Sequence, residues 1–220
     1  MFRAPLTASL LALCAGLGSA HAQTQLYETG PAEDAAFVRF ISALPETLTI
    51  QAAGDSHLVL APESPSTPWQ AVRANTPLSA TLHYDDRSER VDVKVQPGEF
   101  VTVAGVRQDD SWSADVGRES PEDFSAFRVS IGLMNLAPDC SQASLRLAGS
   151  DVEIVAGVNH GDVHRRQINP VSLSAELFCD ASPTGAETVL DSLRAGDRWT
   201  LVVHQGPAGP AILPVLDRMP

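Results

Sequence analysis

Strict alternation of apolar and polar residues recurs along this chain. It is clean in Val91–Val95 and in Phe127–Leu133, and each such run is short and ends at Pro, Gly, Asn or Asp. Successive side chains of a strand point to opposite faces, so alternation with a period of two predicts half-buried strands. After residue 22, no segment keeps a helical period over the roughly ten to twelve residues that a helix requires. The sequence therefore predicts an all-β fold.

Further strands are expected where short apolar runs lie between turn residues. The 16 prolines and 15 glycines fall mostly between these runs, as the connections between strands require. The expected strands are Phe37–Ile41, Leu48–Ala52, His57–Leu60, Leu78–Tyr84, Phe100–Val103, Leu145–Leu147, Val152–Val155, Val171–Cys179 and Trp199–His204.

The two halves of the chain resemble each other in the same order. A repeat spacing of 90 to 98 residues is typical of duplicated domains rather than of solenoid repeats. We therefore expect two small antiparallel β-sandwiches, at 23–110 and 126–220, joined by a polar linker at 111–125. The matching segments are Asn75–Leu82 with Asn169–Leu177, Gln96–Val103 with Arg194–Val202 and, more loosely, Phe37–Phe40 with Phe127–Ser130.

The beginning of the chain has the pattern of a secretory signal. One positive charge precedes the apolar stretch Leu6–Leu13, and small residues ending in Ala-His-Ala follow it. This pattern predicts a signal peptide at 1–22, cleaved before Gln23, and a soluble, exported mature protein. The stretch is shorter than the about 20 apolar residues that span a bilayer. Cys14 raises the alternative of a lipid anchor, although Leu13 stands where a lipoprotein signal has a small residue.

Two cysteines remain after the expected cleavage, Cys140 and Cys179. An even pair in an exported chain indicates a disulfide. Cys179 is also in phase with the apolar face of the strand expected at Val171–Cys179, where a bridge would lie in the core. Two buried free thiols are the alternative.

The charge balance is strongly acidic, with 15 basic against 27 acidic residues and a net charge of −12. Such a chain repels nucleic acid and anionic lipid surfaces, so neither is an expected partner. The sequence contains no glycine-rich phosphate loop, CxxC pair or HExxH motif, and no cofactor is expected.

One short segment departs from the acidic balance. His160, Asp162 and His164 alternate, so in a strand their side chains would share one face and could reach a single metal ion. No fourth ligand is evident, a solvated strand is the alternative, and we assign no metal. With Arg165 and Arg166 the histidines could instead bind a carboxylate of a polymer or a partner protein, because arginine matches a carboxylate through two hydrogen bonds.

Two tryptophans lie in polar contexts and are candidate contact residues. Trp69 and Trp112 could stack on sugar rings or anchor a partner protein, with plain packing in the core as the alternative. Trp199 shares the apolar phase of Leu201 and Val203, which predicts a core position.

Gly54-Asp55-Ser56 matches the nucleophile block of the SGNH esterases and acetyltransferases, in which a serine requires a distant Asp-x-x-His. Asp162 and His164 are one residue too close for that partner motif, and Asp197 and His204 are too far apart. A turn between two strands explains the block better, so no catalytic residue is expected.

Three segments of the chain share a pattern with one known protein family. They are Leu26-Tyr27 with Gly30-Pro31 and Ala35–Arg39, directly after the expected signal, then Arg166–Val171 and Leu193–Trp199. Together with the length and the two-copy β arrangement, these segments resemble the AlgF family of periplasmic alginate O-acetylation proteins.

The resemblance implies an accessory role without catalysis. AlgF-like proteins act with a membrane-bound O-acetyltransferase and with periplasmic SGNH-type acetyltransferases, which together acetylate the mannuronate residues of alginate or related exopolysaccharides. The expected partners are therefore these enzymes. Direct binding and presentation of the polysaccharide is the alternative function, and a Ser56-dependent esterase or acetyltransferase is a distant third.

Overall fold

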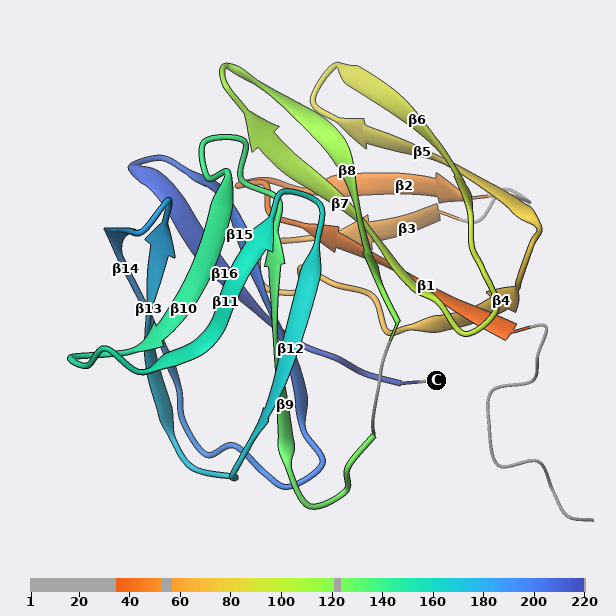
Figure 1. Ribbon diagram of the computed structural model, residues 1–220. Coiled ribbons are helices and arrows are strands. Elements are labelled where there is room, and N and C mark those ends of the chain that lie inside the picture. Colours follow the sequence, from red (N-terminus) through yellow and green to blue (C-terminus); the bar gives the residue numbers. More distant parts are fainter. Residues whose placement is uncertain (1–34, 53–56, 121–123, 220) are drawn as a thin grey trace, which may run out of the picture. The chain divides into compact units, whose positions relative to one another are not determined.

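The computed structural model describes residues 35–52, 57–120 and 124–219, which belong to one compact unit (Figure 1). These residues form strands joined by turns and loops, and no helix occurs among them, which confirms the predicted all-β class. The same described residues accordingly contain no helix that is long and apolar enough to cross a membrane. The expected signal peptide at 1–22 and the Gly54-Asp55-Ser56 block lie outside the described residues.

The strands of the first half pair into two four-stranded sheets. One has the order β4-β1-β7-β8 and the other β3-β2-β5-β6. We call them the junction sheet and the outer sheet of the first sandwich. The strands are β1 Ala35–Ser42, β2 Leu48–Ala52, β3 His57–Leu60, β4 Gln70–Arg73, β5 Pro77–Tyr84, β6 Arg87–Lys94, β7 Phe100–Gln108 and β8 Ser111–Glu119.

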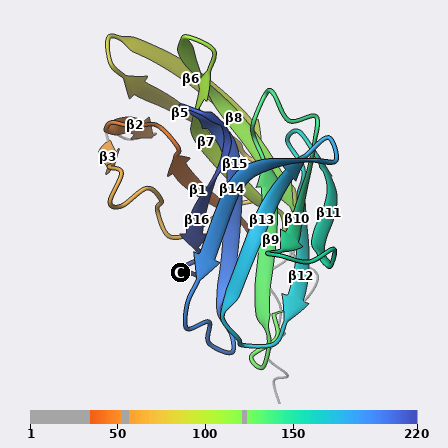
Figure 2. The same cartoon turned by 90° about the vertical axis from the view of Figure 1, so that its left-hand side faces the viewer.

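The second half repeats this arrangement strand by strand. Its junction sheet has the order β12-β9-β15-β16 and its outer sheet β11-β10-β13-β14, in which β10 and β13 lie side by side (Figures 1 and 2). The identical strand order confirms the expected pair of similar sandwiches. The strands are β9 Val129–Asn135, β10 Gln142–Leu147, β11 Glu153–Asn159, β12 Val163–Ile168, β13 Leu173–Cys179, β14 Ser182–Leu190, β15 Arg198–Gly206 and β16 Gly209–Leu216.

Each sandwich contains one parallel pair, β1 with β7 and β9 with β15, whereas the other paired strands are antiparallel. The turn that precedes β7 also recurs before β15. Gly98 and Gly196 have φ of 74° and 88°, a left-handed conformation that glycine adopts without steric cost. The carboxylates of Glu99 and Asp197 accept hydrogen bonds from the backbone three residues earlier, at 2.8 Å in both turns.

The hydrogen bonds of these turns correct one of the expected matches. The backbone N–H of Phe37 donates to the carbonyl of Glu99, and that of Ser130 donates to the carbonyl of Asp197. Phe37 therefore corresponds to Ser130 and not to Phe127. Phe127 precedes β9 and is 84% exposed. The expected match of Phe37–Phe40 with Phe127–Ser130, which aligned the two phenylalanines, was therefore three residues out of register.

The segment 111–125, expected to be a linker, contains β8, which pairs with β7 along its whole length. The first sandwich thus extends to Glu119, where β8 ends, and the second begins with β9 at Val129. Four further strands missing from the expected set (β4, β12, β14 and β16) lie, like β8, at the edge of a sheet. An edge strand pairs on one side only and is partly solvated, so it does not need a strong apolar alternation.

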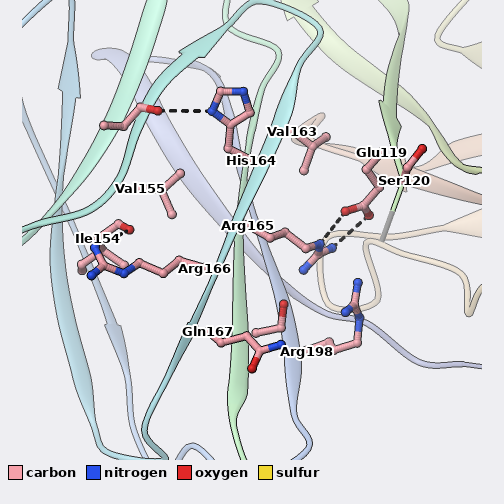
Figure 3. Close-up of a pocket in the computed structure, with 12 residues that line it drawn as sticks. Glu119, Ser120, Ile154, Val155, Val163, His164, Arg165, Arg166, Gln167 and Arg198 are labelled. Atoms are coloured by element: carbon pink, nitrogen blue, oxygen red, sulfur yellow. Dashed lines mark hydrogen bonds and ion pairs between the residues drawn. The ribbon is translucent and has the colours of Figure 1, made fainter. Parts of the chain in front are cut away.

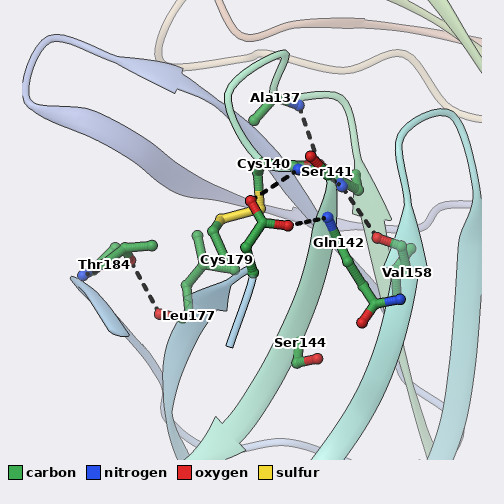
Figure 4. Close-up of a disulfide and its surroundings, with 12 residues drawn as sticks. Ala137, Cys140, Ser141, Gln142, Ser144, Val158, Leu177, Cys179 and Thr184 are labelled. Atoms are coloured by element: carbon green, nitrogen blue, oxygen red, sulfur yellow. Dashed lines mark hydrogen bonds between the residues drawn. A yellow bond between two sulfur atoms is a disulfide. The ribbon is translucent and has the colours of Figure 1, made fainter. Parts of the chain in front are cut away.

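Each sandwich encloses its own apolar core, and the second core contains the Cys140–Cys179 disulfide (Figure 4). This confirms the predicted bridge. The burial of β13 alternates along its length and ends on the buried Cys179, as expected for an inward-facing position. Asn135, fully buried beside the bridge, donates to the carbonyls of Cys140 and Val158 at 2.7 and 3.1 Å.

A third apolar cluster joins the two sandwiches through their junction sheets. Ile41, Ala104 and Val106 of the first sandwich pack against residues of the second. The partners from the second sandwich are Met134, Leu136, Val202 and Val215. Burying these side chains against each other stabilises the association of the two copies, at about 25 cal/mol per Å² of apolar area removed from water.

Candidate functional site

A network of charged side chains lies next to this cluster, in the same junction. Arg39 on β1 is 1% exposed and donates to Thr102 of its own sandwich at 2.9 Å. Its two terminal nitrogens cross to the second sandwich, where they donate to Asp217 at 2.5 Å and Thr200 at 2.8 Å. The Asp217 carboxylate is wholly buried, and the Thr200 hydroxyl donates to it at 2.8 Å.

Arg165 on β12 is the second cation of the network. Its guanidinium donates to both oxygens of Glu119, the last residue of β8, and therefore also bridges the two sandwiches. It reaches the other oxygen of Asp217 at 2.7 Å and the carbonyl of Trp199 at 3.1 Å. Asp217 is thus held between two guanidinium groups.

These neighbours lower the pKa of Asp217. Burial alone would raise it, but the positive charges of Arg39 and Arg165, with hydrogen bonds from Arg39 and Thr200, outweigh that effect and hold the pKa below its usual 3.8. Burial by itself would lower the pKa of Arg165. The hydrogen bond to Glu119 and the negative charges of Glu119 and Asp217 outweigh this effect, so the pKa of Arg165 is raised. Both side chains are charged at neutral pH.

The network combines equivalent positions of the duplicated sandwiches. Thr102 and Thr200 correspond, as do Glu119 and Asp217, at the same spacing in the chain. The copies differ where Arg39 in the first corresponds to Gly132 in the second. Gly132 pairs with Arg165 in the β9–β12 ladder, and a Cβ on it would lie 2.8 Å from Nη1 of Arg165. The absence of a side chain at this position makes room for the second arginine.

We expect Gly132→Ala to destabilise the fold by about 1–3 kcal/mol, because the added methyl group must displace a guanidinium that several hydrogen bonds hold in place. Chemical denaturation of the purified protein measures this loss. In an Arg165→Met background the same substitution should cost less. Equal costs in both backgrounds would show that Gly132 does not act through Arg165.

A groove of about 690 Å³ opens beside the network, between the edge strands β11 and β12 (Figure 3). We call it the β11–β12 groove. Polar groups from other elements close its sides, among them Glu119, Ser120, Ser130 and Arg198. Figure 3 shows Arg165 extending toward Glu119 and Arg166 toward Ile154.

Arg198, the first residue of β15, lines this groove and differs from its neighbours in having few partners. It is 8% exposed, and its Nε is buried without a hydrogen bond among the described residues. The nearest carboxylate oxygen, on Asp217, is 4.0 Å away, and the guanidinium lies over the ring of Phe124 at 4.5 Å. Burial and the charge of Arg165 lower the pKa of Arg198.

The structure buries both tryptophans proposed as contact residues. Trp69 is 2% exposed, with Arg39 stacked on its ring at 4.2 Å, and Trp112 is 7% exposed against Tyr84. Packing is therefore their observed role. Trp199 is partly buried and packs against the second core, close to the expected position.

The histidines and Asp162 do not converge. His160 lies in the turn after β11 and faces Asp115 of β8 at 3.4 Å, whereas Asp162 accepts a hydrogen bond from Asn159. His164, on β12, contacts the carbonyl of Ala156 through Nδ1 at 3.2 Å. Among the described residues, no group of three or more His, Cys, Asp or Glu side chains could hold a metal ion.

The two arginines proposed to bind a carboxylate have different surroundings. Arg165 does bind carboxylates, but they belong to the chain itself. Arg166 is exposed and donates to the carbonyls of Glu153 and Ile154 on β11. Sequence reasoning missed Arg198, Arg39 and Asp217. For Arg39 a signal was available, because it is a charged residue that alternates with the apolar Phe37 and Ile41 on one face of β1.

No known family model matches this chain, and no curated protein matches its sequence. Two solved structures share a distant likeness. A family CBM26 module of Amy13K from Eubacterium rectale, in complex with maltoheptaose, is 11% identical, with a TM-score of 0.26 over 84% of this chain and 97% of its own. The TIE protein of Bacillus anthracis is 8% identical, with a TM-score of 0.28 over 78% of this chain and 34% of its own. Likenesses of this degree carry no argument about function.

Proposed function

We propose that this chain is a non-catalytic periplasmic adaptor in the O-acetylation of an exopolysaccharide such as alginate. Its partners are a membrane-bound O-acetyltransferase and periplasmic SGNH-type acetyltransferases, as the resemblance to the AlgF family implies. The proposal is supported by one structural observation above others, the junction between the two sandwiches.

The junction suits an adaptor because it fixes one sandwich against the other. Arg39 and Arg165 each contact carboxylates or hydroxyls of both copies, and a shared apolar cluster lies beside them. Buried ion pairs demand particular geometries, so they favour one arrangement of the two copies over others. Partners bound to the two sandwiches are then held at a constant separation.

The outer sheets supply surfaces for such partners. β5 and β6 in the first sandwich, and β13 in the second, alternate buried with more exposed residues, so each outer sheet has one solvated face. The exposed side chains include the Arg90–Asp92 pair on β6 and Ser174 with Glu187 on β13 and β14. Both faces can therefore be occupied without disturbing the junction.

A binding experiment with purified components tests the adaptor. The immobilised mature chain, 23–220, should capture the periplasmic SGNH-type acetyltransferase of the same organism and then, without releasing it, the detergent-solubilised O-acetyltransferase. Heat-denatured chain on the same surface is the control. Binding of neither enzyme, or mutual exclusion of the two, would contradict the proposal.

A second candidate function is direct binding and presentation of the polysaccharide. The groove beside Arg198 favours it, because that groove offers a cation with few partners in an otherwise acidic chain.

A further inference from the structure

We propose that the β11–β12 groove and its extension along 124–128 bind an anionic polysaccharide, with Arg198 holding the carboxylate of a uronate residue and Phe124 stacking on its sugar ring. The choice of a uronate polymer rests on the proposed function. The binding of a carboxylate at Arg198 does not, because it follows from the charges and contacts of the groove itself.

The charge balance of the junction leaves one cation uncompensated. Arg39, Arg165 and Arg198 face two carboxylates, those of Glu119 and Asp217. Arg39 donates a hydrogen bond to Asp217, and Arg165 donates to both Glu119 and Asp217. The Nε of Arg198 instead stands 4.0 Å from the nearest carboxylate oxygen, on Asp217. The Nε of Arg198 is buried without an acceptor, which is costly, and a carboxylate that binds the guanidinium through two oxygens would reduce that cost.

Arg198 lies where a ligand can reach it from two sides. It lines both the β11–β12 groove and a smaller pocket of about 230 Å³ beside 124–128, and the two cavities share Ser130 and Gln167 as well. The two cavities therefore adjoin at Arg198, and we refer to them together as the channel. Serine hydroxyls such as that of Ser130 hydrogen-bond to sugar hydroxyls, and an extended chain of sugars fits a channel better than an isolated pocket.

The ring of Phe124 supplies the apolar contact that sugar binding requires. It is 52% exposed, lines the smaller pocket and carries Arg198 over one face. An exposed aromatic ring beside a guanidinium can pack against the C–H face of a sugar while the cation takes the carboxylate. Phe100 contacts the ring of Phe124 and so supports it from the first sandwich.

The edge of β11 that faces the groove is already occupied, which disfavours an acidic peptide. A peptide in this groove would be expected to add as a strand, through the unpaired carbonyls of an edge strand. Arg166 donates to the carbonyls of Glu153 and Ile154, and His164 contacts that of Ala156. Side chains of β12 thus cover this edge, and the groove offers side chains rather than backbone to a ligand.

The acidic total of the chain does not exclude such a ligand. Charges separated by more than about 8 Å are largely screened at physiological salt, so the groups within the channel decide. Among the residues that the structure describes, the carboxylates there already have partners: Glu119 accepts from Arg165, and Asp197 accepts from the backbone of Arg194. Arg128 and Arg166 add exposed positive charge along the same channel.

Isothermal titration of the mature chain with a mannuronate hexasaccharide tests the proposal, with the neutral mannose hexasaccharide and a hexaglutamate peptide as the other ligands. We expect binding of the mannuronate hexamer alone. Arg198→Met should weaken it by about tenfold or more, as the loss of a charge-assisted hydrogen bond does, and Phe124→Ala by several-fold. Arg87→Gln, at the exposed start of β6 in the first sandwich, is the charge-matched control and should leave the affinity unchanged.

Melting temperatures separate ligand binding from a structural role. Because Arg198 is a buried cation with few partners, Arg198→Met should melt at the same temperature as the wild type or higher. A fall in melting temperature with unchanged affinity would show that Arg198 serves the fold, and would overturn the proposal. Binding of hexaglutamate in place of the mannuronate hexamer, or of neither, would overturn it too. Capture of the acetyltransferases by Arg198→Met is expected in every case, so the adaptor is tested separately.

Discussion

Asp217→Asn should lower the stability of the protein by about 3–5 kcal/mol at pH 7, the cost of breaking a buried ion pair. The substitution keeps the shape of the side chain but removes the charge that faces Arg39 and Arg165. Two buried guanidinium groups then share the carboxylate of Glu119 alone. For a chain of this size we expect the melting temperature to fall by roughly 10 °C, which calorimetry measures.

The same variant should change the response to acid. Since the pKa of Asp217 is lowered in the folded state, its ionised form stabilises the fold above the usual pKa of 3.8, and this contribution is lost as the pH falls through the folded-state value. The wild type should therefore lose stability below about pH 4 more steeply than Asp217→Asn, and the difference between them should shrink.

Asp92→Asn is the matched control. Asp92 lies on β6 and pairs with Arg90 at 3.1 Å, but both side chains are largely exposed. Exposed pairs contribute little to stability because water and salt screen them, so this variant should melt like the wild type. Equal melting temperatures of Asp217→Asn and the wild type at pH 7 would contradict the assignment of Asp217 as the centre of the network.

Removing the disulfide should cost a comparable amount. Cys140 and Cys179 are 39 residues apart, and closing a loop of that length stabilises a protein by about 4 kcal/mol at 25 °C in the chain-entropy account. The double variant Cys140→Ala/Cys179→Ala should accordingly unfold at lower denaturant concentration, with the change concentrated in the second sandwich, whose core contains the bridge.

A reducing agent provides the control for this prediction. It should lower the stability of the wild type toward that of the double variant and leave the variant unchanged. Loss of stability in the reduced variant would point to a second redox-sensitive group. An unchanged midpoint in the reduced wild type would show that the bridge does not limit unfolding.

Every inner strand was expected, and the five strands that were missed all lie at the edge of a sheet, although the edge strands β3, β6 and β11 were expected. β2 and β3 have the expected bounds because their apolar residues must alternate or cluster to reach the core. β8 was taken for a linker because its polar residues, such as Ser113 and Asp115, can face solvent while the backbone pairs with β7. Backbone pairing is independent of side-chain polarity, and no period in the sequence records it.

The sequence indicated which residue types could form a site, but not which residues contact each other. Arg165 was expected to bind a carboxylate of a polymer or a partner protein, whereas the carboxylates it contacts belong to Glu119 and Asp217, which are 46 and 52 residues away along the chain. Trp69 stands in a polar stretch and was a candidate contact residue, yet Arg39 covers its ring. Pairs this distant in sequence meet only when two sheets pack, which local patterns do not describe.

The sequence by itself determined the all-β class, the duplication and the disulfide, because period, repeat spacing and cysteine pairing are properties of the chain taken in order. Only the tertiary structure decided which charges are satisfied. The junction brings Glu119 from one copy and Asp217 from the other to the same arginines, and it leaves Arg198 beside them without an equal partner. The free energy of a buried charge depends on its distance to other charges and on its access to water, and both are set by packing.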